Sequence, residues 1–385
     1  MRRQGWRMVA TLGALSLVAA ACGSVDPTIA GAGPRGVPTT LPPPTTTTTL
    51  DPSLTATEGY FEIPVGGADL YNVANGTVVQ TIAQGLTLGF ISRSGEWLEV
   101  LTPCGTTAFM TDSQVTPVAK TTARATSDLS RLVLVVDPGH GGRDWGGVGP
   151  TGTSEKSVNM EISLRLKELL ETPHNIDFVT GEITPGSEYS RVKSVLLTRS
   201  PDGPDGGDYE LGLAYRAGLA NTAGAHALIA IHNNTVPTQA ASRPGSEVFY
   251  AASVPDSDRL AGLIYDELVK SLAPFDAQWS GGQLLGARAR IDPKSGDDYY
   301  GLLRRAEMPA VIVEGAYLSE PEEEALLKTG DFQQAYADGV YRGIVRFFTT
   351  PDTSTSIFQP EPFPDDSGTV SSRSCKVPTQ SGGAP

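Results

Sequence analysis

Five short apolar runs between residues 131 and 349 constrain the fold more than any other feature of the chain. They alternate with two stretches in which an apolar residue recurs about every fourth position, one after Ser154 and one over residues 260–272. Near-continuous apolar strands between amphipathic helices indicate an α/β fold with a largely parallel central sheet covered by helices. The runs are Leu132–Val136, Val195–Leu197, Ala227–Ile231, Glu247–Tyr250 and Ala310–Val313.

Three of these runs end in residues that can bind a metal ion or transfer a proton. The first leads into a glycine-rich turn that contains His140, the third is followed by His232, and the last by Glu314. In open α/β sheets the functional site lies beyond the carboxyl ends of the strands. We therefore expect these three side chains to converge.

Glu155 adds a second carboxylate to this group. It follows Ser154, a suitable N-cap, and so opens a helix whose positive end favours the ionised carboxylate. Two histidines and one carboxylate, with a fourth position open for water, form a common catalytic zinc set, and zinc lowers the pKa of bound water to about 7. The sequence predicts a Zn²⁺ site held by His140, Glu155 and His232, with Glu314 as the general base.

Other polar residues are expected to have structural roles. His174 and His226 lie away from the strand ends, and His226 begins its strand on the side of the sheet opposite to His232. The acidic run at residues 322–324 is most simply a solvated helix face. Arg199 and Asp202 are expected to fix a loop as a pair, without a part in catalysis.

Several ordered motifs in this region resemble a known family. They are Asp137–Gly142, Gly152–Lys156, Leu197–Asp202, Ile231–Asn234 and Met308–Ser319. Together they are similar to the zinc-dependent N-acetylmuramoyl-L-alanine amidases, which hydrolyse the amide between N-acetylmuramic acid and the L-alanine of the peptidoglycan stem. The resemblance implies the same zinc ligands and the same catalytic glutamate, and it makes peptidoglycan the expected substrate. Ala230, Asn233 and Glu320 differ from the residues usual in that family, but the metal set is complete.

The N-terminus has the pattern of an export signal. Three arginines precede an apolar run over residues 8–21, which is too short to cross a bilayer comfortably. The sequence Val18–Cys22 resembles a bacterial lipobox, although alanine replaces the usual leucine three residues before the cysteine. We expect residues 1–21 to be a signal peptide and Cys22 to carry lipid, which anchors the protein outside the cytoplasm on a membrane that faces the cell wall.

The remaining segments are interpreted from composition. Residues 22–57 are rich in proline and threonine and are expected to form a linker. Residues 58–119 contain short β-type runs separated by glycines, and the stretch Ser94–Val100 resembles bacterial SH3-like domains. The α/β domain is expected over residues 131–349, followed by a disordered tail at 350–385.

Charge and cysteine content limit the possible partners. The formal net charge of −14 makes nucleic acid an unsuitable partner. After signal removal and lipidation two cysteines remain, Cys104 and Cys375, which suggests one disulfide in an oxidising compartment, although the sequence cannot show that they meet. Two alternatives stay open: a zinc peptidase that cuts within the stem peptide, and a non-catalytic wall-binding protein.

Overall fold

The computed structural model describes residues 60–63, 66–82, 87–102, 104, 106–118, 128–201, 212–282 and 284–363. The predicted signal peptide, Cys22, the linker, Asp202 and Cys375 lie outside these ranges. Within them, no helix is both long and apolar enough to span a membrane. Cys104 is disulfide-bonded, and its pairing with Cys375 stays a prediction.

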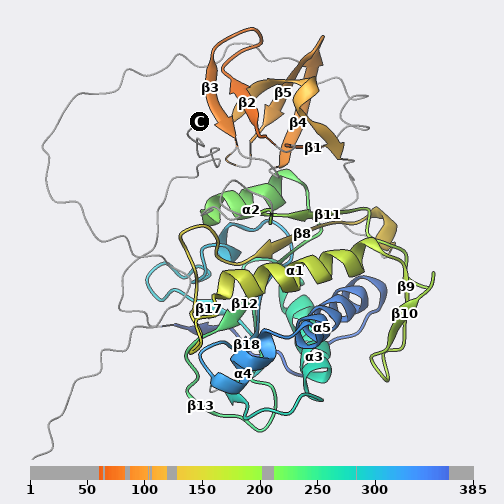
Figure 1. Cartoon of the computed structure of the whole chain (residues 1–385), viewed down its shortest axis with the longest axis vertical. Coiled ribbons are helices and arrows are strands. Elements are labelled where there is room, and N and C mark those ends of the chain that lie inside the picture. Colours follow the sequence, from red (N-terminus) through yellow and green to blue (C-terminus); the bar gives the residue numbers. More distant parts are fainter. Residues whose placement is uncertain are drawn as a thin grey trace, which may run out of the picture.

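A six-stranded sheet forms the centre of the larger domain (Figure 1). Its strands in spatial order are β11 (Ser194–Leu197), β8 (Val133–Pro138), β12 (Ala227–Asn234), β18 (Ala310–Tyr317), β14 (Glu247–Tyr250) and β16 (Ala287–Arg288). All neighbouring strands in this sheet are parallel except β14 and β18, which are antiparallel. Four of the five pairings are parallel, so the sheet is largely parallel as the sequence predicted, and the one antiparallel pairing makes it mixed. The antiparallel pairing arises because no helix separates β12 from β14, so the chain turns back without the crossover that a parallel neighbour needs.

Helices cover both faces of this sheet. The α1 (Glu155–Glu171), α3 (Ser257–Leu272) and α5 (Gly330–Thr349) helices pack together on one face, and α2 (Leu213–Thr222) covers the other. Successive residues of β8 serve the two faces in turn: Leu134 and Val136 contact the three-helix layer, whereas Val133 and Val135 contact the α2 layer. The continuous apolar runs in the sequence reflect this burial on both sides.

Short elements complete the larger domain. They are α4 (Pro321–Leu327), the 3₁₀ turns Leu129–Arg131 and Leu303–Arg305, and the paired strands β9 (His174–Ile176) with β10 (Ile183–Pro185), β13 (Gln239–Ala240) with β15 (Ser280–Gly281), and β17 (Arg290–Ile291) with β19 (Glu361–Pro362).

The N-terminal region forms a separate antiparallel sheet. Its strands are β1 (Tyr60–Glu62), β2 (Ala68–Tyr71), β3 (Val78–Ile82), β4 (Thr87–Ser94), β5 (Trp97–Leu101), β6 (Thr107–Thr111) and β7 (Thr116–Val118), with a 3₁₀ turn at Asp112–Gln114. Its described residues thus have the β content that the sequence predicted. The likeness to SH3-like domains stays a prediction.

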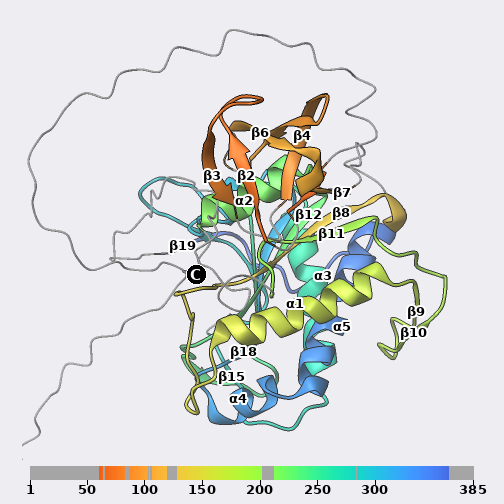
Figure 2. The ribbon, with the colours of Figure 1, turned by 45° about the horizontal axis from the view of Figure 1, so that its top comes forward.

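Helix α2 lies between the two sheets in both views (Figures 1 and 2). The Tyr215 side chain of this helix is fully buried, and it belongs to the apolar core of the N-terminal domain together with Leu88 and Phe90. Gly89 is so close to α2 that an added Cβ would stand 2.9 Å from the Thr222 methyl group. The small domain is thus packed against the larger one.

Residues 351–363 differ from the prediction of a disordered tail. The amides of Phe358, Glu361 and Phe363 donate to carbonyls of residues 287–291 at 2.8–3.1 Å. An edge strand leaves backbone groups unpaired, and this segment satisfies them. The proline- and serine-rich composition did not reveal this role because the partners lie far away in the sequence.

Candidate metal centre and active site

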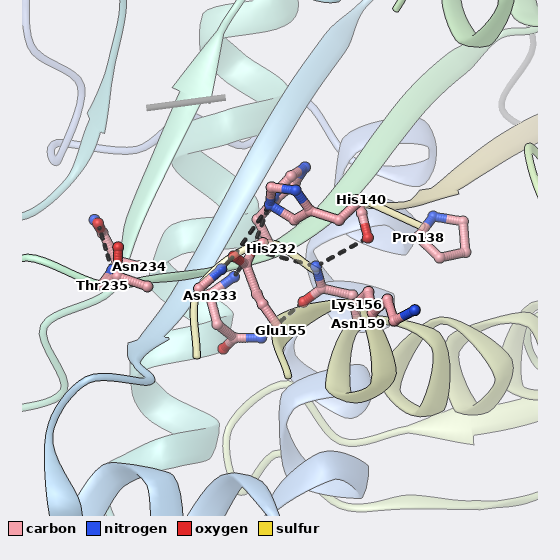
Figure 3. Close-up of polar contacts among 12 residues, drawn as sticks. Pro138, His140, Glu155, Lys156, Asn159, His232, Asn233, Asn234 and Thr235 are labelled. Atoms are coloured by element: carbon pink, nitrogen blue, oxygen red, sulfur yellow. Dashed lines mark hydrogen bonds and ion pairs between the residues drawn. The ribbon is translucent and has the colours of Figure 1, made fainter. Parts of the chain in front are cut away.

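Strand register brings the predicted functional residues together. His232 of β12 is the direct neighbour of Glu314 of β18, and His140 follows the end of β8. Glu155 is the first residue of α1, with Ser154 at the N-cap position, although the serine side chain makes no capping hydrogen bond. One ligand atom each from His140, Glu155 and His232 lies within 4.8 Å of the others, and the three side chains point toward one another (Figure 3).

Both histidines contact the same carboxylate. Nε2 of His140 lies 3.1 Å from one oxygen of Glu155, and Nδ1 of His232 lies 3.0 Å from the other. Glu155 and His232 are 4% and 6% exposed. Two imidazole nitrogens and a buried carboxylate are the donors that zinc prefers, so these residues fit that ion.

The charges of the three groups depend on one another. Burial alone would lower the pKa of His140, but the carboxylates of Glu155 and Asp144 outweigh it and raise that pKa to about 10. Burial would likewise raise the pKa of Glu155, yet His140 and His232 hold it well below its ordinary value. The carboxylate of Glu155 is therefore ionised, which is the state that a metal ligand needs.

Asp144 and Asn159, which the sequence analysis did not single out, orient the candidate ligands together with Asn233. Asp144 contacts Nδ1 of His140 at 3.0 Å, which leaves Nε2 directed at the site. The amide nitrogen of the Asn159 side chain lies 3.3 Å from a Glu155 oxygen, and the backbone amide of Asn233 donates to the same oxygen at 3.1 Å. Such partners fix the orientation of metal ligands. Asp144 and Asn159 each follow a candidate ligand by four residues, and this shared spacing could have identified them from the sequence.

Two buried arginines hold the turn that carries His140. Arg216 donates to the carbonyls of Pro138 and His140 at 3.0 and 2.5 Å, and Arg199 donates to the carbonyl of Pro138 at 2.8 Å. Arg216 also pairs with the buried carboxylate of Asp137 at 2.5 Å. His140 has a φ of 63°, which is unfavourable for a residue with a side chain and needs such support. Arg199 is thus a loop-fixing residue as expected, although the expected partner Asp202 lies outside the described residues.

Glycine is required at two positions beside the ligands. A Cβ on Gly139 would stand 2.2 Å from Nε2 of His232. A Cβ on Gly146, where φ is +67°, would stand 2.6 Å from a carboxylate oxygen of Glu155. These glycines let the loop pass against the ligand side chains.

Glu314 lies beside the three candidate ligands without bonding to them. It is 9% exposed, and its Oε2 is buried with no hydrogen-bond partner among the described residues. Burial, followed by the charges of Glu155 and Glu247, raises its pKa well above the ordinary value. The carboxylate opens into a pocket that contains all the predicted site residues. This pocket is lined by His140, Gly147, Glu155, His232, Asn233, Asn234, Thr235, Phe249, Arg290, Tyr300 and Glu314.

The acidic run at the start of α4 is not a solvated face, as the sequence analysis expected. Glu323 and Glu324 are both fully buried. Glu324 accepts hydrogen bonds from the amides of Thr151 and Thr153 at 2.9–3.2 Å, which fixes the loop that leads to Glu155. The prediction was wrong because buried backbone amides from elsewhere in the chain provide the partners that carboxylates need.

The other two described histidines are outside the site. His226 is 3% exposed, and its Nδ1 accepts a hydrogen bond from the amide of Val133 at 3.1 Å. His174 packs edge-on against Tyr341 with ring centroids 5.6 Å apart. Their structural roles agree with the expectation from the sequence.

Two histidines and a carboxylate at the strand ends of an α/β domain, next to a further buried carboxylate, give this protein the layout of a metal-dependent hydrolase. Residues 134–346 match the model of the N-acetylmuramoyl-L-alanine amidase family. The chain belongs to this family, which makes it a peptidoglycan amidase.

The individual relatives compared with this chain share 25–28% sequence identity with it. The chain is 28% identical to the germination-specific N-acetylmuramoyl-L-alanine amidase of Bacillus subtilis over 57% of this chain and 81% of the relative. It is 27% identical to N-acetylmuramoyl-L-alanine amidase AmiC of Escherichia coli over 56% of this chain and 53% of the relative. Among solved structures, amidase AmiC2 of Nostoc punctiforme shows 25% identity, coverage of 56% of this chain and 96% of that chain, and a TM-score of 0.41.

The arginine contacts predict a specific loss of stability. Arg216→Met leaves the carboxylate of Asp137 buried without its cation, which should lower the free energy of unfolding of the larger domain by about 3–5 kcal/mol. Arg216→Lys keeps the charge but not the forked geometry and should lose less. Denaturant unfolding followed by circular dichroism measures both, with exposed Arg191→Met as the control. An unchanged midpoint for Arg216→Met would contradict the role given to this residue.

Proposed function

We propose that this protein hydrolyses the amide between N-acetylmuramic acid and L-alanine with a zinc ion held by His140, Glu155 and His232. The observation that carries the proposal is the convergence of these three donors next to a buried, unbonded carboxylate oxygen of Glu314 in one pocket. A site with three protein donors leaves a position for water or substrate, as catalytic zinc sites require.

The residues divide the work as follows. Zinc, when bound, supplies a water of lowered pKa and polarises the substrate carbonyl. Glu314 accepts a proton from the attacking water, and its raised pKa suits a group that must first take up a proton and then release it. The oxygen of the water joins the carbonyl carbon, the carbon–nitrogen bond breaks, and Glu314 gives the proton to the departing amine of L-alanine. Asp144 and Asn159 keep the ligands in place throughout.

This division predicts different outcomes for two kinds of variant. Replacing a ligand, as in His232→Ala, should reduce both bound zinc and activity. Glu314→Gln keeps the size of the side chain and removes the proton acceptor, so it should retain zinc and lose about 100-fold or more in turnover. Elemental analysis and the rate on purified peptidoglycan measure the two effects. Loss of zinc from Glu314→Gln would make Glu314 a ligand, and full activity would reject it as the base.

Mass analysis of the products separates this function from its alternatives. An amidase releases intact stem peptides from the glycan. A zinc peptidase on the same fold would release shortened stems, and a wall-binding protein would release nothing.

The high pKa of His140 in the metal-free protein predicts a proton-linked affinity. At pH 7 this imidazole is protonated, since its pKa is raised to about 10, whereas a metal needs the neutral form. Zinc binding should therefore release about one proton, and the affinity should rise about tenfold for each pH unit from 7 toward 10. Calorimetric titration in buffers of different ionisation enthalpy measures the released proton. Binding heats that do not depend on the buffer would contradict this linkage.

A cell-wall substrate supports a location of this activity outside the cytoplasm. We propose that Cys22 is the lipidated N-terminus, that residues 22–57 span the distance to the wall, and that the N-terminal β domain is an SH3-like module that binds wall material. The apolar run that ends at Cys22 supports the anchor.

The anchor is tested by Cys22→Ser. The change removes the acylated thiol and should release the protein from the membrane fraction or block its processing. Fractionation and immunoblotting measure this outcome, with the unchanged protein as the control. A Cys22→Ser protein that is processed normally and stays on membranes would rule the anchor out.

A further inference from the structure

Arg290 lines the same pocket as Glu314 but has no part in the proposed chemistry. It lies on β17, and the pairing of this strand with β19 fixes the backbone at the residues just before and just after Arg290. The amide of Glu361 donates to the carbonyl of Ala289 at 3.1 Å, and the amide of Phe363 donates to the carbonyl of Ile291 at 2.8 Å. The position of Arg290 is therefore set by the segment that the sequence analysis expected to be disordered.

Aromatic rings enclose the guanidinium group of Arg290. Its central carbon lies 4.5 Å from the ring centre of Phe249, 4.2 Å from that of Phe363 and 5.7 Å from that of Tyr300. One terminal nitrogen donates to the hydroxyl of Tyr300 at 2.7 Å. Rings packed against a guanidinium hold it rigidly and exclude water from its faces, so its edges remain for hydrogen bonds.

The neighbouring Arg288 differs from Arg290 because its charge is neutralised by salt bridges within the protein. Arg288 forms salt bridges with Glu247 at 2.8 Å and with Glu361. In the described part of the chain Arg290 forms no salt bridge, whereas the Nε atoms of both arginines are buried without a hydrogen-bond partner. A part-buried guanidinium that lines the pocket and forms no salt bridge is available to a carboxylate ligand through its terminal nitrogens.

The charges around Arg290 indicate which ligand it could bind. The ionisable residues nearby include the carboxylates of Glu155 and Glu314, and the chain as a whole carries a formal charge of −14. A bound zinc ion would offset the charges of Glu155 and Glu314, which leaves Arg290 as a cation of the pocket that is available to an acidic stem peptide. Arg290 is close enough to Glu314 to lower its pKa, and so it acts within the same site.

From these contacts we infer that Arg290 is a specificity residue that binds a free carboxylate of the stem peptide near the cleaved bond. The inference rests on the proposed function and extends it to the substrate. The enzyme then prefers stems whose second residue is D-isoglutamate, which has a free carboxylate, over stems in which this group is the carboxamide D-isoglutamine.

The test crosses two substrates with two forms of the enzyme. Synthetic muramoyl peptides that differ only in this carboxylate or carboxamide are hydrolysed by the wild type and by Arg290→Gln. The wild type should show about 10- to 100-fold higher kcat/KM on the carboxylate substrate, mainly through KM, the size expected for a charge-assisted hydrogen bond. Because Arg290 also lowers the pKa of Glu314, Arg290→Gln should slow both reactions, but it should slow the reaction of the carboxylate substrate about 10- to 100-fold more, so that the preference is lost. Arg290→Lys keeps the charge and should retain part of it.

Controls separate specificity from folding and from the amidase activity itself. Arg191→Gln removes an exposed arginine outside the pocket and should keep the wild-type preference. Calorimetric titration with the product peptides, in the carboxylate and carboxamide forms, gives a second measure that does not need turnover. Equal wild-type affinity and rate for both forms, or a preference that survives Arg290→Gln, would overturn the inference. Failure of the wild type to cleave either substrate while it still binds the carboxylate form more tightly would reject the amidase mechanism and leave the subsite standing.

Discussion

The carboxylate of Glu155 is the contact on which the rest of the site depends. Its two oxygens contact His140 and His232, and they also accept the backbone amides of Gly147 and Asn233 at 2.8 and 3.1 Å. One side chain thus joins the start of α1, the loop after β8 and the end of β12. Because the carboxylate is buried and ionised, each of these donors must be in place.

The sequence was most informative where chemistry and periodicity coincide. Polar residues at the ends of apolar runs can be recognised because strands of one sheet end at a common edge, so His140, His232 and Glu314 could be placed together before any coordinates. Glu155 could be added because a helix start and a serine cap are local signals. The mixed character of the sheet could not be read in this way, since the direction of β14 depends on a connection without a helix.

What the sequence could not show are contacts between distant residues. Glu324 resembles a surface residue until Thr151 and Thr153 supply its hydrogen bonds, more than 170 residues earlier in the chain. Phe363 lies in a stretch of tail-like composition, yet its ring packs on Arg290. Composition describes what a segment prefers by itself, whereas burial is decided by partners that composition does not contain.

Helix α2 connects the two domains through consecutive residues. Tyr215 completes the apolar core of the small domain, and Arg216 holds the turn that carries His140. The conformation of the turn that carries His140 and the packing of the small domain therefore both depend on helix α2. A catalytic fragment that starts between residues 118 and 128 would expose the Tyr215 ring to water. Removal of the small domain therefore perturbs the helix that holds the turn with His140, and the properties of the isolated fragment would differ from those of the same domain in the whole chain.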